Sequence, residues 1–159
     1  MKIESGSFLG RPPTAAISSV ERAYRISFPK DYLRFLDTYN GAVPVDLCVE
    51  IDGHERLIVF FLSILDRRVD VGEAWVTDIS TTLAQIGARL VEDSDKDKVG
   101  LKLIPFAALF GGDYLCLDFR NNYAKPSVAY WDHASTVFQP ITSHVALSFG
   151  EFCKGLGMA

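Results

Sequence analysis

The chain has 159 residues, of which 48% are hydrophobic and 23% charged, and its formal net charge at pH 7 is -4. This length suits one domain with one substantial core, and the composition is that of a globular protein rather than a disordered one. The acidic balance disfavours direct attachment to nucleic acid or to an anionic membrane, because both select basic surfaces. We therefore expect a single domain over residues 1–159, with no nucleic-acid or membrane partner.

Targeting signals and cysteines point to a reducing compartment. The first residues lack the apolar stretch of a secretory signal, and the longest apolar runs, such as 57–62, are too short to cross a bilayer. Cys48, Cys116 and Cys153 are far apart and lie among apolar neighbours, which predicts neither a disulfide framework nor a Cys-x-x-Cys metal site. We expect a cytoplasmic protein with three reduced thiols.

Helical periodicity in residues 14–39 predicts two short helices separated by Phe28-Pro29. Pro29 suits the first position of the second helix, and Asn40-Gly41 can end it in a left-handed conformation. Ser18 and Glu21 form either a capping box of the first helix or part of its polar face. Two further helices are predicted, at 78–90 and after the Ser-x-x-Glu capping box of residues 148–151.

Alternating hydrophobicity predicts strands between these helices. Leu47, Val49 and Ile51 alternate with polar residues, and Asp52-Gly53 offers a hairpin turn. The following run, 57–62, is apolar at every position, as in a strand that is covered on both faces. Residues 113–119 and 127–132 predict another hairpin, and residues 92–98 a solvated, mobile loop. The sheet should therefore contain at least four strands.

Three ordered blocks of residues carry a resemblance to a known family. The blocks comprise 20–21 (VE), 28–32 (FPKDY) and 35–41 (FLDTYNG); then 104–107 (IPFA), 111–114 (GGDY), 117–118 (LD) and 126–133 (PSVAYWDH); and finally 146–152 (ALSFGEF). In this succession the chain resembles the SUKH superfamily of fungal cell-wall-synthesis regulators and bacterial toxin-immunity proteins. One departure is Ala42, where many relatives continue Asn-Gly-Gly. The resemblance implies an α+β fold, with a mixed, largely antiparallel sheet and about four helices, and no shared catalytic residue set.

One cluster of residues, Asp118 with Asp132-His133 and Cys116, offers the only chemistry that resembles catalysis. Asp118 and His133 would act as a carboxylate–imidazole pair if neighbouring strands brought them together, with Cys116 as the nucleophile. A buried cysteine more often behaves as a small hydrophobe, and no nucleophile elbow or phosphate-binding loop accompanies these residues. The histidines at 54, 133 and 144 lack metal-ligand spacing. We therefore expect no catalytic residue, no metal and no cofactor.

Acidic residues on the predicted strands are the candidates for partner binding. Glu50 and Asp52 lie opposite the apolar positions of their strand, while Asp118 and Asp132 end two strands that could be neighbours. They form either an acidic binding surface or an ordinary solvated face. Tyr130 and Trp131 fall on opposite faces of one strand, so at most one of them can anchor a given surface.

These observations favour a non-enzymatic protein-binding module. The resemblance implies an immunity protein that neutralises a cognate bacterial toxin by direct binding, and the acidic balance suits a basic nuclease as that toxin. An intracellular regulator or scaffold related to the fungal proteins is the alternative, and a hydrolase using Asp118 and His133 is a distant third. A homodimer is compatible with the sequence.

Overall fold

The structure, a computed structural model, describes residues 1–66, 72–91, 98–135 and 140–158. Its centre is a six-stranded sheet in which every neighbouring pair is antiparallel and the strands follow chain order. The strands are β1 Cys48–Ile51, β2 His54–Phe61, β3 Leu103–Leu109, β4 Tyr114–Asp118, β5 Ser127–Asp132 and β6 Ile141–Ala146. Both predicted hairpins are confirmed, while β6 was not foreseen. Most of the predicted loop at 92–98 lies outside the described residues.

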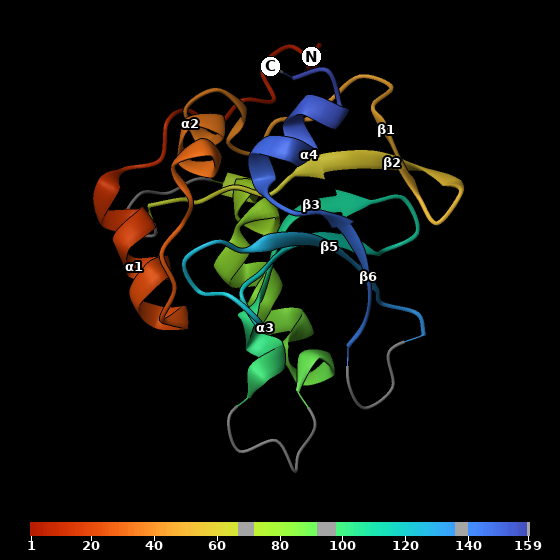
Figure 1. Cartoon of the computed structure of the whole chain (residues 1–159). Coiled ribbons are helices and arrows are strands. Elements are labelled where there is room, and N and C mark those ends of the chain that lie inside the picture. The colour runs from red at the N-terminus through yellow and green to blue at the C-terminus, as the bar shows by residue number, and fades with distance from the viewer. Residues whose placement is uncertain (67–71, 92–97, 136–139, 159) are drawn as a thin grey trace.

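Four α-helices and two short 3-10 helices surround this sheet (Figure 1). They are α1 Thr14–Tyr24, α2 Lys30–Tyr39, η1 Gly72–Thr77, α3 Ile79–Leu90, η2 Val99–Lys102 and α4 Phe149–Gly155. All four predicted helices are thus present. The predicted α+β class, with about four helices on a largely antiparallel sheet, is confirmed.

Local sequence signals set most helix ends. Helix α2 begins one residue later than predicted, so that Pro29 is its N-cap. Ser148 caps α4 by accepting a hydrogen bond from the Glu151 amide at 3.2 Å. Glu21 does not cap α1, which begins at Thr14; its carboxylate instead accepts a hydrogen bond from the Phe28 amide at 2.8 Å, across the turn to α2. The polar-face interpretation of Glu21 is therefore the correct one.

Asn40 does more than end a helix. Its buried side chain donates to the Gly10 carbonyl at 2.9 Å and to the Ile64 carbonyl at 3.3 Å, and accepts from the Ile64 amide at 2.8 Å. Gly41 then turns with φ +73°, and a Cβ there would lie 2.5 Å from the Leu9 side chain. The Asn-Gly pair thus joins the N-terminal arm, the end of α2 and the segment after β2.

Helices α2 and α4 cover one face of the sheet through a cluster of aromatic rings. Phe106 of β3 lies 5.2 Å from Phe149, ring centre to ring centre, and 6.2 Å from Tyr32. Phe35 contacts the same cluster at 5.2 Å from Phe149. Such edge-on contacts between buried rings supply much of the apolar burial that holds helices on a sheet. Most apolar residues of the residue blocks that carry the resemblance are buried here, among them Phe35, Leu36, Phe106, Leu117 and Phe149.

Helix α3 covers the opposite face, but only over the middle of the sheet. It packs chiefly on β3 and reaches the end of β5 through Arg89, which lies 2.5 Å from the His133 ring nitrogen. In Figure 1 the β1–β2 hairpin projects to the right, away from α3. The expectation that residues 57–62 are covered on both faces is therefore wrong for β2, because α3 leaves one face of this strand open to solvent.

Candidate partner-binding surface

The open face of the β1–β2 hairpin displays two acidic residues directly opposite each other. A turn at Asp52-Gly53, with φ +51° and +77°, joins the strands, as the Asp-Gly pair favours. This turn fixes a register in which Glu50 pairs with Glu55 and Cys48 with Leu57. All four of these side chains are exposed, while Val49 and Ile51 on the other face are buried.

Exposed apolar residues continue this face along β2. Leu57 is 39% exposed and Val59 is 37% exposed, two positions apart on the same side of the strand. Phe110, in the β3–β4 turn, is 77% exposed, and its amide donates to the Leu57 carbonyl at 2.9 Å. Sequence reasoning missed these residues because it placed 57–62 between two layers. We call the residues Cys48, Glu50, Asp52, Glu55, Leu57, Val59 and Phe110 the hairpin surface.

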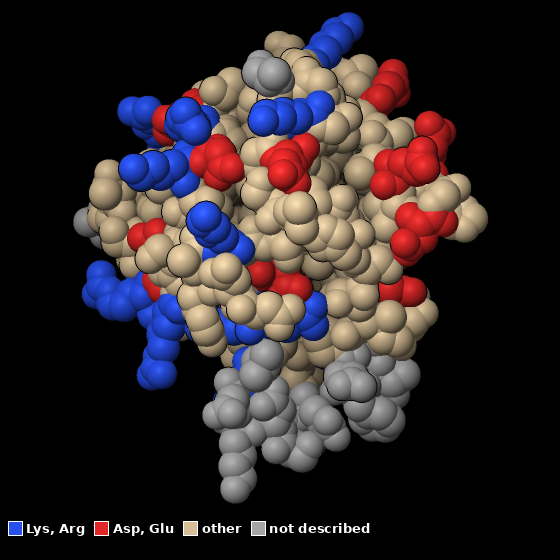
Figure 2. Space-filling model, viewed as in Figure 1, with Lys and Arg blue, Asp and Glu red and all other residues tan. Residues whose placement is uncertain are grey.

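The charge of the hairpin surface is acidic. Figure 2 shows Asp and Glu side chains gathered on the right, where Figure 1 places the hairpin, while Lys and Arg gather on the left. Among the described residues, the ion pairs found join Arg11 to Asp37, Arg56 to Asp113 and Arg120 to Asp118, so none neutralises Glu50 or Glu55. A solvated pair of like charges opposite each other destabilises a hairpin slightly.

Asp118, the third predicted binding residue, does not belong to this surface. It is only 7% exposed, and its carboxylate accepts from the Arg120 guanidinium at 2.7 and 2.9 Å and from the Arg120 amide at 3.0 Å. Arg120 also donates to the Thr142 hydroxyl at 2.8 Å. The expectation that Asp118 is an exposed charge is wrong, because this bidentate ion pair encloses it and ties β4 to β6.

Asp132, the fourth candidate, is half-buried at the far end of the sheet. Strands β4 and β5 are neighbours as expected, but they run antiparallel, so Asp118 pairs with Ser127 and Asp132 lies at the opposite end of β5. Hydrogen bonds from Ser135 hold the pKa of the Asp132 carboxyl below its usual value. The four predicted acidic residues therefore do not form one surface; only Glu50 and Asp52 lie together.

The same antiparallel pairing separates Asp118 from His133. His133 lies six residues beyond Ser127, the partner of Asp118, which corresponds to about 20 Å along a strand. Each of the two is held by a different arginine, Asp118 by Arg120 and His133 by Arg89. Burial also raises the pKa of the Cys116 thiol, which keeps it protonated and a poor nucleophile. The geometry provides no carboxylate–imidazole pair at these positions.

Neither aromatic residue of β5 is an exposed anchor. Trp131 is fully buried and stacks on Tyr114 with ring centres 5.9 Å apart. Tyr130 is buried on the opposite face, where its hydroxyl donates to Asp113 at 2.6 Å and the Arg56 guanidinium lies 4.4 Å above its ring. Both rings are therefore part of the core, and neither is available to a partner.

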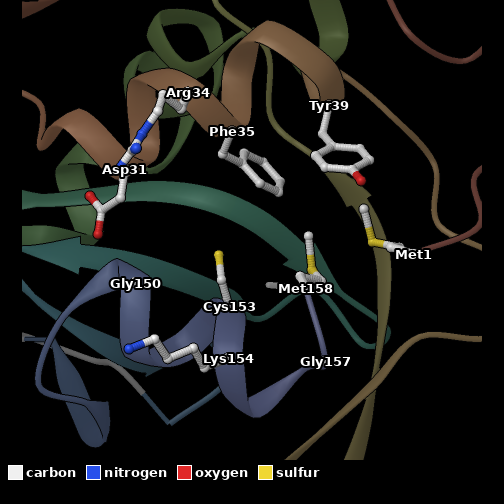
Figure 3. A pocket seen from close by; sticks show the side chains of 10 residues that line it. All are labelled: Met1, Asp31, Arg34, Phe35, Tyr39, Gly150, Cys153, Lys154, Gly157 and Met158. Atoms are coloured by element: carbon white, nitrogen blue, oxygen red, sulfur yellow. The ribbon is translucent and has the colours of Figure 1, made fainter.

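A groove of about 560 Å³ opens between α2 and α4. Phe35 and Tyr39 of α2 point into it from one side and Cys153 of α4 from the other, with Met1 and Met158 at one end (Figure 3). Burial and the nearby Asp31 carboxylate raise the pKa of the Cys153 thiol to about 11. The groove therefore holds a thiol that is protonated at neutral pH rather than a reactive one.

Two other kinds of functional feature are absent from the described residues. No described group of three or more His, Cys, Asp or Glu residues is placed to hold a metal ion. No helix in the described ranges is long and apolar enough to cross a membrane. What the described residues do offer is the hairpin surface.

Comparison with known proteins identifies the family but no individual relative. The sequence matches the family SUKH_6, described as SMI1-KNR4 cell-wall, over residues 14–152. No curated protein and no solved structure gives a significant match. The matched range contains every strand and all three residue blocks that carried the resemblance. The chain therefore belongs to the SUKH superfamily.

Proposed function

We propose that this protein is an immunity protein that neutralises a cognate bacterial toxin by binding it through the hairpin surface. The observation that carries the proposal is the open face of β1–β2, where the opposed Glu50 and Glu55 adjoin the exposed Leu57. Membership of the SUKH superfamily supports a role of this kind, because the resemblance to that superfamily implies either a toxin-immunity or a regulatory role, and fold alone does not specify the partner.

The physical argument concerns the cost of displaying these groups in the free protein. Opposed like charges on a hairpin oppose its folding by a few tenths of a kcal/mol, on the order of the 0.2–1 kcal/mol by which cross-strand pairs affect stability. The exposed apolar side chains beside them stay in contact with water and so contribute no free energy of burial to the fold. A cationic partner surface would relieve the repulsion and cover Leu57 and Val59, so that both unfavourable features of the free chain would become binding energy.

Growth rescue tests this function directly. The product of the gene beside this one is expressed under an inducible promoter, and we expect it to arrest growth and this chain to restore it. Purified components should then bind with an association rate that falls as salt rises, because screening weakens the attraction between the acidic surface and a basic toxin. If the neighbouring product arrests growth and the chain fails to rescue it, the proposal fails in favour of a regulatory role.

A charge reversal locates the surface. Glu50→Lys should lower the association rate at least tenfold at low salt, because it removes attraction and adds repulsion. It should keep the fold, since a lysine opposite Glu55 replaces a repulsive pair by an attractive one. Glu73→Lys, an equal charge change at an exposed position in η1, is the matched control and should leave the rate unchanged. Equal rates for the two variants would place the partner elsewhere.

A further inference from the structure

The outer edge of β1 carries backbone groups that pair with no other strand. In the β1–β2 ladder the Ile58 amide donates to the Leu47 carbonyl at 2.8 Å, which makes Leu47–Ile58 a hydrogen-bonded pair. The register then makes Val49 and Ile51 hydrogen-bonded positions, and it turns the amides and carbonyls of Cys48 and Glu50 away from β2. Among the described residues, no hydrogen bond uses these four groups.

A groove of about 250 Å³ runs beside this edge. Its walls are Cys48, Val49 and Glu50 of β1 and Val145 and Ala146 of β6, and α4 closes its floor. Consecutive residues of a strand point to alternate faces of the sheet. Because Cys48, Val49 and Glu50 all line the groove, the groove must run along the backbone edge of β1. The two edge strands of this curved sheet thus approach each other across α4. The volume is small for a drug-sized ligand and suits one or two side chains.

We infer that a partner adds an extended, basic segment to the edge of β1, within this groove. This inference rests on the proposed function and names how the toxin would be held. An added strand would satisfy the outward amides and carbonyls of Cys48 and Glu50, as in strand addition generally. The groove is therefore a site for main-chain recognition as well as for side chains.

The residues that line the groove determine which side chains of the added segment should be apolar and which should be basic. Side chains that point inward would meet Val49 and Phe152, which are buried, so those positions of the segment should be apolar. Side chains that point outward would lie beside Glu50, so those positions should be basic. A second copy of this chain fits poorly, since pairing two β1 edges would bring Glu50 residues of both copies together.

The test uses a blocked hexapeptide of alternating lysine and valine, with a glutamate–valine peptide as the matched control. With the lysine peptide at saturation, we expect amide exchange of Cys48 and Glu50 to slow at least tenfold, and resonances of Val145 and Ala146 to shift. The amide of Val49 already pairs with β2 and serves as the internal reference. The inference is overturned if the lysine peptide leaves Cys48 and Glu50 unprotected, or if the glutamate peptide protects them equally.

The same exchange measurement on the toxin complex separates this inference from the proposed function. Neutralisation of the toxin without protection of Cys48 and Glu50 would retain the immunity role and overturn the strand addition. Protection by the lysine peptide without any neutralisation would retain the edge site and overturn the immunity role. Glu50→Lys, checked for folding by circular dichroism, should weaken binding of the lysine peptide at least tenfold.

Discussion

Removing the Asp118 carboxylate should destabilise the protein far more than removing any acidic residue of the hairpin surface. In Asp118→Ala the Arg120 guanidinium, whose side chain is 21% exposed, loses two charge-assisted hydrogen bonds, and its charge stays largely enclosed. Breaking one partner of a buried ion pair costs about 3–5 kcal/mol, and the residual exposure of Arg120 places the expected cost near the lower end, at about 3 kcal/mol.

Urea unfolding followed by circular dichroism measures this cost. With a dependence of about 2 kcal/mol per molar urea, the midpoint of Asp118→Ala should fall by about 1.5 M. Glu50→Ala is the matched control, because Glu50 is exposed and faces a like charge; its midpoint should change by no more than about 0.25 M, corresponding to about 0.5 kcal/mol.

A second variant distinguishes two causes of the destabilisation, the unpaired charge left on Arg120 and the loss of the contact between Asp118 and Arg120. Asp118→Ala/Arg120→Ala removes both charges, so it should recover at least about 1 kcal/mol of the stability that Asp118→Ala loses. The reasoning is refuted if Asp118→Ala unfolds at the same urea concentration as Glu50→Ala. In that case the bidentate pair would contribute nothing to stability.

Two substitutions and one alkylation measurement test the core and the α2–α4 groove. Tyr32→Phe should raise stability by about 1 kcal/mol in calorimetry, because the buried hydroxyl has no hydrogen-bond partner among the described residues; a loss of stability would reveal a partner. Phe149→Ala should cost about 3–5 kcal/mol, since it empties the centre of the aromatic cluster, and an unchanged melting temperature would contradict the docking of α4. The thiol of Cys153, with its pKa raised to about 11, should be alkylated at pH 8 about a hundredfold more slowly than in the unfolded chain, and below pH 11 its rate should rise about tenfold for each unit by which the pH is raised. The exposed Cys48 should react first. Equal alkylation rates of Cys153 in the folded and unfolded chains would contradict its burial.

The candidate site could be predicted only in part. Glu50 and Asp52 were identified correctly as exposed neighbours, because alternation in a short strand places Glu50 and the Asp-Gly turn places Asp52 without help from the rest of the fold. Leu57 and Val59 were missed, because an apolar run looks the same whether one face is covered or two. Phe110 follows a buried strand and carried no signal that its ring faces solvent.

The sequence by itself determined the local structure: the helices, the two hairpins, the capping serine at 148, the left-handed turn at Gly41 and the superfamily. The helices, hairpins, cap and turn each depend on residues a few positions apart, where periodicity and turn chemistry act directly, whereas the superfamily was indicated by the order of three residue blocks along the chain. Only the tertiary structure decided that Asp118 is enclosed by Arg120, that His133 lies at the other end of β5, and that α3 leaves the hairpin surface open. These facts depend on strand direction and on where a helix docks, which contacts between distant parts of the chain set and no short pattern of residues encodes.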